Sequence, residues 1–162
     1  KIKPDQYEVS RDFEILNEIS WFKPNAPPNL SCRYFAHSHE TLLWAKKNKK
    51  SKHKFNYELM KSWDVRKDKI NNYGKQMRSV WSIPLTPKKE KIDGGHPTQK
   101  PIELLKRIIL ASSEKNDTIL DPFNGSGTTG IVSKMTGRKY IGIDKEKSFL
   151  NMTLKRFKEN LK

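Results

Sequence analysis

The chain has 162 residues, enough for one domain with a single core, and its hydrophobic content of 34% is low for a self-contained α/β domain. Lysine and arginine outnumber the acids by 33 to 18, which favours a polyanionic partner, with a solvated basic surface as the alternative. A lone cysteine excludes an internal disulfide, and the lack of an apolar run of about eighteen residues argues against a membrane span, so we expect a cytoplasmic protein.

The N-terminal third predicts two strands separated by a rigid loop. The second half of residues 13–22 has the pattern of a strand, and a second strand is expected at residues 41–45. Between them, the prolines in residues 23–29 fix φ and remove hydrogen-bond donors, so this stretch should be neither helix nor sheet.

Aromatic residues gather after this proline-rich loop. We interpret Tyr34, Phe35 and Trp44 first as packing residues, with stacking on a nucleic-acid base as the alternative for Tyr34 and Phe35. The nearby histidines and the cysteine lack the spacing of a zinc site, and no metal is expected.

Regular patterning ends between Lys46 and Asp93. Residues 46–54 form a dense basic run, followed by aromatic residues scattered among further lysines and arginines. Like charges this close repel one another, and backbone phosphates would neutralise them. A mobile solvated loop is the alternative, and the two interpretations are compatible.

A helix is predicted to follow the sequence His-Pro-Thr-Gln-Lys-Pro at residues 96–101. Pro101 suits a first helical turn, where its missing N–H is not needed. An apolar face then extends to about Ser112, formed by Ile102, Leu105, Ile108 and Ile109.

Residues 118–130 have the pattern of a strand, a glycine turn and a helix. The apolar strand ends on Asp121, and the helix is expected to begin at Thr128. Glycines allow close approach of a ligand, and a helix N-terminus offers N–H donors. A second buried strand at residues 140–144 ends on Asp144, placed as the acid that holds ribose hydroxyls in such units. The Gly-x-Gly-x-x-Gly spacing alone is weak, and an ordinary strand-to-helix turn is the alternative.

The last helix is expected from about Glu146 to Leu161. One apolar stripe is formed by Phe149, Leu150, Thr153, Leu154, Phe157 and Leu161, with lysines toward solvent. We interpret this helix as core packing without a role in chemistry.

Several motifs resemble those of one enzyme family. Asp-Pro-Phe-Asn-Gly-Ser-Gly-Thr-Thr at residues 121–129 resembles the cofactor loop of amino-group DNA methyltransferases, which bind S-adenosylmethionine. Residues 19–29, 33–35 and 39–46 are similar to the middle motifs of that family, and residues 96–101 to a motif that lies against its cofactor. The resemblance is especially close to Dpn-type adenine methyltransferases, which modify GATC in restriction–modification systems.

The resemblance implies an α/β, doubly wound, Rossmann-like methyltransferase fold, incomplete at its N-terminal side. It implies that Asp144 binds the ribose, that residues 121–129 wrap the methionine part and that residues 96–101 close the pocket. The implied cofactor-binding residues are His96, Pro97, Thr98, Gln99, Lys100, Pro101, Asp121, Pro122, Phe123, Asn124, Gly125, Ser126, Gly127, Thr128, Thr129 and Asp144.

The same resemblance divides the chain by role. Residues 46–95 would be a target-recognition insert and residues 96–162 the cofactor-binding half, all within one methyltransferase domain at 1–162. The partner would be double-stranded DNA, with single-stranded DNA as a further option, and the target base would be flipped out of the helix. The candidate DNA contacts are Arg33, Tyr34, Lys49, Lys50, Lys52, Arg66, Lys75 and Arg78.

The catalytic motif of the family, Asp-Pro-Pro-Tyr, does not occur in this sequence. We therefore assign no catalytic residue and expect this polypeptide to be inactive alone, as the C-terminal part of an adenine-N6 methyltransferase. Cytosine-N4 methylation, a non-catalytic DNA-binding remnant, and a subunit completed by an N-terminal fragment or by a homodimer stay open. A dinucleotide oxidoreductase would explain the glycines and Asp144 but not the other motifs. The sheet is expected to have an unpaired edge and uncovered apolar surface.

Overall fold

The structure is a computed structural model that describes residues 11–64, 68, 70–91 and 98–160. The chain divides into two compact units, which meet in the sequence between Pro84 and Leu85. Each unit has its own sheet, so the strands do not form one continuous sheet in the part of the chain that is described. The predicted division of roles at residues 46–95 and 96–162 stays a prediction.

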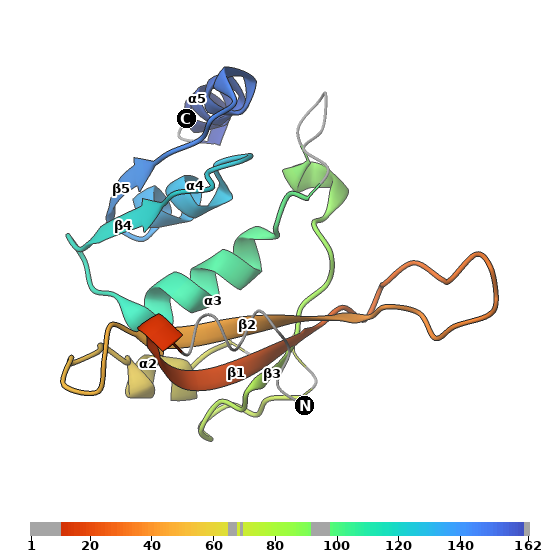
Figure 1. The fold of residues 1–162 in the computed structure, drawn as a ribbon, viewed down its shortest axis with the longest axis horizontal. Coiled ribbons are helices and arrows are strands. Elements are labelled where there is room, and N and C mark those ends of the chain that lie inside the picture. Colours follow the sequence, from red (N-terminus) through yellow and green to blue (C-terminus); the bar gives the residue numbers. More distant parts are fainter. Residues whose placement is uncertain (1–10, 65–67, 69, 92–97, 161–162) are drawn as a thin grey trace. The chain divides into compact units, whose positions relative to one another are not determined.

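The N-terminal unit contains a three-stranded sheet in the order β2–β1–β3 (Figure 1). Strand β1 (Glu14–Phe22) pairs antiparallel with β2 (His39–Lys46), from Glu14 opposite Lys46 to Phe22 opposite His39. The short strand β3 (Val80–Ser82) runs parallel to β1 on its other edge. Both predicted strands exist, and both are longer than expected. No helix or strand was predicted between residues 46 and 93, where the structure has β3, helix α2 (Tyr57–Lys61) and the 3-10 turn η1 (Lys88–Glu90).

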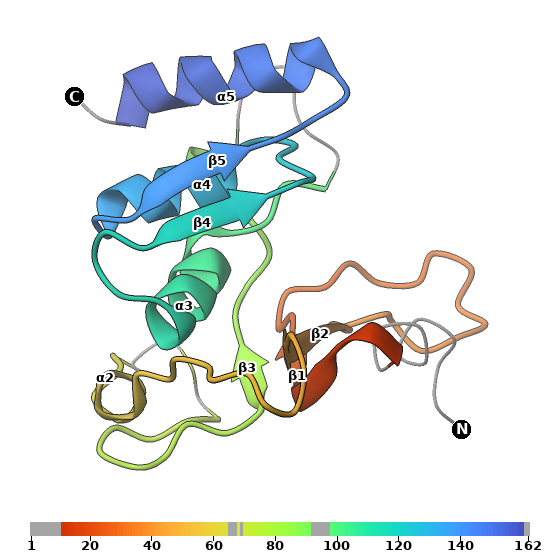
Figure 2. The same ribbon diagram turned by 60° about the vertical axis from the view of Figure 1, so that its left-hand side comes forward.

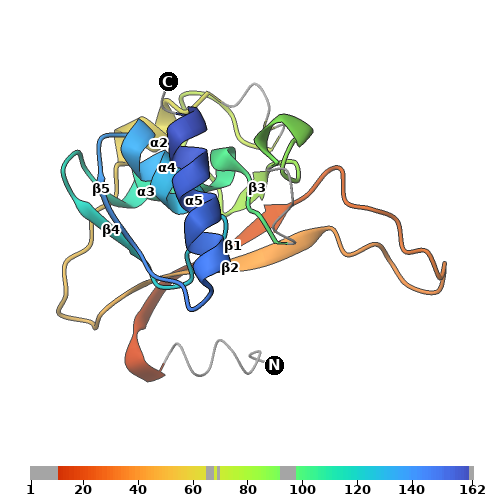
Figure 3. The same cartoon turned by 90° about the horizontal axis from the view of Figure 1, so that it is seen from above.

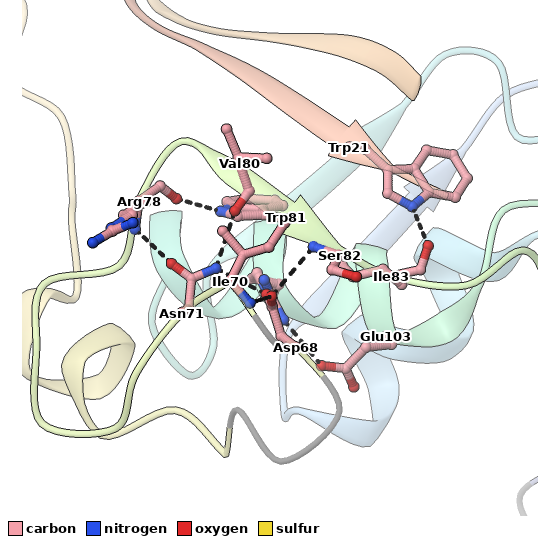
Figure 4. Close-up of polar contacts among 11 residues, drawn as sticks. Trp21, Asp68, Ile70, Asn71, Arg78, Val80, Trp81, Ser82, Ile83 and Glu103 are labelled. Carbon is pink, nitrogen blue, oxygen red and sulfur yellow. Dashed lines mark hydrogen bonds and ion pairs between the residues drawn. The ribbon is translucent and has the colours of Figure 1, made fainter. Parts of the chain in front are cut away.

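Polar side chains join β3 to the rest of this unit (Figure 4). The buried Trp21 indole donates from Nε1 to the Ile83 carbonyl at 2.7 Å. The buried Asp68 carboxylate accepts from the backbone N–H of Ser82 at 3.4 Å and from Asn71 Nδ2 at 2.9 Å. Because a three-residue strand has few ladder bonds of its own, these contacts help to hold it in register.

A long arm, residues 23–38, connects β1 to β2 and projects beyond their paired ends (Figures 1 and 3). Its turn is built around Asn29, whose Oδ1 accepts from the Ser31 backbone N–H at 2.9 Å and whose carbonyl accepts from the Cys32 N–H at 3.1 Å. Within the arm, Tyr34 is 77% exposed and Phe35 is fully exposed. The packing interpretation of these two residues was therefore wrong. It is confirmed for Trp44, whose ring centroid lies 5.2 Å from that of Phe55.

The C-terminal unit is built on a parallel β–α–β arrangement (Figure 2). Strand β4 (Thr118–Asp121) leads into helix α4 (Thr128–Met135), and β5 (Lys139–Gly142) returns beside β4. Helices α3 (Ile102–Ser112) and α5 (Lys147–Asn160) both pack against α4. Strand β4, the start of α4 and the range of α3 agree with the sequence predictions. Strand β5 ends earlier than predicted, two residues before Asp144.

Only one face of the β4–β5 pair is covered by α4. The Tyr140 ring faces Gly130 of α4, whereas its neighbours Leu120 and Ile141 are 58% and 52% exposed and lie on the other face, as strand alternation requires. Among the described residues, β4 pairs with β5 alone. The predicted uncovered apolar surface and unpaired strand edge are therefore present.

Candidate functional site

The loop between β4 and α4, residues 122–127, bends twice through left-handed backbone. Gly125 and Gly127 have φ values of 50° and 72°, a region that side chains with a Cβ disfavour. The bend is closed by a hydrogen bond from the Gly127 N–H to the Asn124 carbonyl at 2.8 Å. Upstream, the Asp121 carboxylate accepts from the Phe123 N–H at 3.0 Å. We call residues 122–128, which include the first residue of α4, the glycine loop.

Asp144 lies directly against the glycine loop. Its Oδ2 accepts from the Gly125 N–H at 2.7 Å, and its Oδ1 accepts from the Glu146 N–H at 2.9 Å. The loop is tied to the same segment a second time, because the Asn124 N–H donates to the Ile143 carbonyl at 2.9 Å. A carboxylate has about four lone-pair positions and can accept several hydrogen bonds at once.

The surroundings of the loop fit a nucleoside with a charged tail. Phe123 is 87% exposed beside the bend, which offers an apolar surface. No side-chain oxygen caps α4, and the first N–H groups of a helix have no acceptor within the helix. Together with the Asp144 carboxylate, these groups supply an apolar contact, anion-binding donors and hydroxyl acceptors in one short stretch.

The segment before α3 is held by hydrogen bonds between side chains and backbone that involve Thr86 and Glu90, the last residue of η1. The Thr86 hydroxyl donates to the Gln99 carbonyl at 2.6 Å, and Gln99 Nε2 donates to the Glu90 carbonyl at 2.6 Å. The Glu90 carboxylate accepts from the Ile102 N–H at 2.9 Å and so satisfies the start of α3. Thr98 is exposed, and Gln99 and Lys100 are half-buried. Pro101 is the residue before the helix and not its first turn. The predicted His96 and Pro97 lie outside the described residues.

Behind the glycine loop, a polar network was not foreseen from the sequence. The Tyr140 hydroxyl donates to Asn124 Oδ1 at 2.6 Å, and Asn124 Nδ2 donates to Thr153 Oγ1 at 2.8 Å. Burial, assisted by the nearby negative charge of Asp121, raises the pKa of the Tyr140 hydroxyl well above its ordinary value, so it is a donor at neutral pH.

Helix α5 supplies Thr153 to that network and carries a second buried polar side chain, Arg156, which contradicts its interpretation as core packing alone. Thr153 and Arg156 are 6% and 2% exposed, while Leu154, assigned to the apolar stripe, is 61% exposed. The available signal was the spacing: Arg156 lies three residues after Thr153 and seven after Phe149, and is therefore on the stripe. Similarly, the fully inward positions of α3 include Leu104 and Ile109, not Leu105 and Ile108.

The predicted DNA contacts that the structure describes are all exposed. In residues 46–54, which we call the basic loop, Asn48 Oδ1 accepts from the N–H groups of Lys50 and Ser51 at 3.0 Å each. This local turn presents Lys49, Lys50 and Lys52 to solvent. Arg66 lies outside the described residues. The described exposed candidates are Arg33, Tyr34, Lys49, Lys50, Lys52, Lys75 and Arg78, all in the N-terminal unit.

Two kinds of feature are absent from the described residues. No helix there is long and apolar enough to cross a membrane. No group of three or more histidine, cysteine or acidic residues is arranged to hold a metal ion within the same residues.

The chain matches the profile of a family described as DNA methylase over residues 3–155. It belongs to this DNA methylase family. Among curated relatives it is 61% identical to the type II methyltransferase M2.LlaDCHI of Lactococcus lactis subsp. cremoris and 59% identical to M2.DpnII of Streptococcus pneumoniae. Both matches cover 89% of this chain and 51% of the relative. The chain thus spans about half the length of these relatives.

Solved structures support the assignment of the fold. The complex of M1.HpyAVI with SAM superposes with a TM-score of 0.72 at 33% identity, over 94% of this chain and 66% of that one. The PvuII DNA methyltransferase, named as cytosine-N4-specific, gives a TM-score of 0.73 at 20% identity, over 93% of this chain and 54% of that one. The Rossmann-like methyltransferase fold predicted from the motifs is confirmed for this DNA methylase chain.

Proposed function

We propose that the chain is the C-terminal part of a type II DNA methyltransferase that transfers a methyl group from S-adenosylmethionine to the exocyclic N6 of adenine, within GATC. The observation that carries the proposal is the junction of the glycine loop with Asp144 through the Gly125 N–H, in a chain of the DNA methylase family. Relatives named as type II methyltransferases support the class of reaction, and the SAM complex of M1.HpyAVI supports the cofactor.

Each part of the glycine loop has a proposed role toward the cofactor. The Asp144 carboxylate accepts from the ribose hydroxyls, and Phe123 covers the apolar part of the ligand. Thr98 and Lys100, with the donors at the start of α4, meet the charged methionine end. The bound cofactor would supply an electrophilic methyl group, and the protein mainly positions this group and the amine.

The N-terminal unit is proposed to contact DNA. Exposed lysines of the basic loop suit backbone phosphates, which fix position without reading sequence. The exposed Tyr34 and Phe35 of the arm suit stacking on a base, with Arg33 next to them in the sequence. Methylation of bacterial DNA would place the activity in the cytoplasm.

A second polypeptide segment is proposed to complete the enzyme. Parallel sheets are normally covered on both faces, but Leu120 of β4, Ile141 of β5 and Ile143 just after β5 are each more than half exposed. The sequence has no Asp-Pro-Pro-Tyr motif. A segment that carries this motif and covers the bare face would supply both missing parts; a second copy of this chain would cover the face without supplying the motif.

Calorimetry with S-adenosylmethionine and its demethylated product tests the cofactor site in the chain itself. We expect binding to the wild type and at least a tenfold loss in Asp144→Asn, which keeps size but removes the charge. A wild-type chain that takes up neither compound would refute the proposal.

Labelled S-adenosylmethionine and a GATC duplex test the reaction. We expect transfer only after addition of a segment homologous to the N-terminal half of the relatives, with the label recovered as N6-methyladenine. Recovery as N4-methylcytosine would instead establish the cytosine alternative. Cofactor and DNA binding without transfer under any complementation would favour the non-catalytic remnant.

A further inference from the structure

Arg156 is a buried charge on an otherwise exposed part of α5. Its side chain is 2% exposed, while its neighbour Lys155 is 61% exposed and Leu154 lies in solvent to the same extent. Arginine is almost never fully buried unless its donors are matched by acceptors, because removing the charge from water is costly. The position of Arg156 therefore requires a specific set of partners.

Two of those partners belong to the glycine loop. Arg156 Nη1 donates to the Ser126 carbonyl at 2.7 Å and to Thr128 Oγ1 at 2.9 Å. Ser126 Oγ also lies 3.2 Å from Thr128 Oγ1, so one guanidinium engages both residues that flank Gly127. Burial lowers the pKa of Arg156, and the negative charge of Glu90 opposes that shift. Arginine stays protonated in proteins, so these are charge-assisted bonds.

Thr153, one turn earlier on α5, contacts the other end of the same loop. Its hydroxyl accepts from Asn124 Nδ2 at 2.8 Å and lies 3.4 Å from the Gly125 carbonyl. A Cβ placed on Gly127 would lie 2.4 Å from Thr153 Cγ2. Helix α5 thus contacts residues 124–128 along their length, through side chains that sit 28 to 30 positions later in the sequence.

This arrangement does more than pack a helix. An apolar side chain at position 156 would fill the space but leave the Ser126 carbonyl without this donor in a buried site. The two glycines adopt left-handed backbone without strain, but glycine has many other conformations open to it, so contacts from outside the loop help to select this one. Because Arg156 is buried, it acts on a ligand through the loop and not by contact.

We propose that Arg156, together with Thr153, is a positioning residue that fixes the glycine loop in its ligand-binding conformation, an inference that rests on the proposed S-adenosylmethionine site. The loop, not the Asp144 side of the site, is then the part that depends on α5. Loss of the guanidinium should weaken recognition of the methionine half of the ligand more than recognition of the nucleoside half.

The test compares Arg156→Met with Lys155→Met, a matched control that removes an exposed charge from the adjacent position. Calorimetry with S-adenosylmethionine and a titration with adenosine give the two affinities for the whole chain. We expect Arg156→Met to weaken S-adenosylmethionine about 10- to 100-fold and adenosine less than about threefold, since each charged hydrogen bond is worth about 1.5–3 kcal/mol. Lys155→Met should match the wild type.

Glycine amide signals in nuclear magnetic resonance spectra supply a second readout. Those of Gly125 and Gly127 should shift in Arg156→Met, while amides of β4 and α3 stay in place. Arg156→Lys keeps the charge but not the planar fork, so it should recover part of the affinity for S-adenosylmethionine. If Arg156→Met does not fold, Arg156→Lys and Thr153→Val carry the same comparison.

The outcomes separate the two proposals. A wild type that binds S-adenosylmethionine while Arg156→Met binds it equally well would overturn the positioning role alone. An equal loss of both ligands, with signals moved throughout the unit, would also overturn it, because that is the effect of a general packing defect. A wild type that binds neither ligand would remove the proposed function, and the positioning role with it.

Discussion

The glycine loop and the basic loop are two turns of similar length that are held in opposite ways. The glycine loop is fixed by side chains from β5 and α5, 16 to 30 residues away in the sequence. The basic loop is fixed by Asn48, whose acceptors serve residues two and three positions later. A turn held from a distance has its shape set before a ligand arrives, whereas a locally held turn can adapt to a partner. The difference fits the two proposed partners, a small cofactor for the glycine loop and a polyanion for the basic loop.

The largest effect is expected from adding a methyl group at Gly127. Gly127→Ala combines a φ of 72° with a clash at 2.4 Å against Thr153, and we expect a loss of about 3–5 kcal/mol in unfolding free energy together with loss of cofactor binding. Urea denaturation measures the first effect and calorimetry the second.

Gly137 offers the matched control for that substitution. Its φ is 76°, but an added Cβ would meet Lys115 Cγ at an ordinary 3.6 Å. Gly137→Ala should therefore lower the free energy of unfolding only by the strain of a left-handed alanine, about 1 kcal/mol, and leave cofactor binding unchanged. Equal losses in the two variants would show that the contact with α5 does not matter.

The two asparagines provide a direct comparison between the loops. Asn124 is 5% exposed, and truncating it would remove its hydrogen bonds to the Tyr140 hydroxyl and to Thr153. We therefore expect Asn124→Ala to lower the free energy of unfolding by about 2–3 kcal/mol. Asn48 is exposed, and Asn48→Ala should cost less than about 1 kcal/mol because water replaces its bonds. Thermal denaturation of both variants checks the pair; a larger loss at Asn48 would contradict the contrast drawn between the loops.

Sequence patterns predicted the elements whose cause is local. Strand β4, the start of α4 and the range of α3 follow from short apolar runs, a proline and a set of glycines. Arg156 was missed because its partners lie 28 and 30 residues earlier in the sequence. Judged from its neighbours alone, an arginine among lysines indicates a charge that faces solvent. Strand β3 was missed for a similar reason, since pairing with β1 and the bond to Asp68 define it, not its own three residues. Tyr34 and Phe35 were misassigned because aromatic character does not distinguish a packing residue from an exposed one.

Removal of three charges from the basic loop should weaken DNA binding in a salt-dependent way. We expect the triple variant of Lys49, Lys50 and Lys52 to Gln to reduce the slope of log affinity against log salt by about 2–3, as loss of up to three phosphate contacts requires. Fluorescence anisotropy with a duplex at several salt concentrations measures this slope. The control removes three exposed lysines of α5, Lys147, Lys155 and Lys158, and should change the slope by less than about 1. Identical slopes for the two triple variants would assign DNA binding to net charge alone.

The smallest effect is expected from pH at Tyr140. Its pKa in the folded protein lies above the ordinary value of 10, so the native state keeps the proton at a pH where the unfolded chain releases it. The stability of the wild type relative to Tyr140→Phe is therefore fully present below pH 10 and declines as the pH rises above it. Denaturation midpoints of the two proteins between neutral and alkaline pH test the sign. A difference that grows with pH would mean that the native state ionises first.

The bare face of β4–β5 has a consequence for how the polypeptide behaves in solution. Leu120, Ile141 and Ile143, beside an open strand edge, form an exposed apolar surface that favours self-association. A net charge of +15 opposes association, because copies of the chain repel one another. Added salt shortens the range of that repulsion to about 10 Å at 0.1 M, while it leaves the apolar attraction intact. Self-association, followed by light scattering, should therefore rise with ionic strength. High salt, used to strip nucleic acid from the chain during purification, would thus also bring its molecules together.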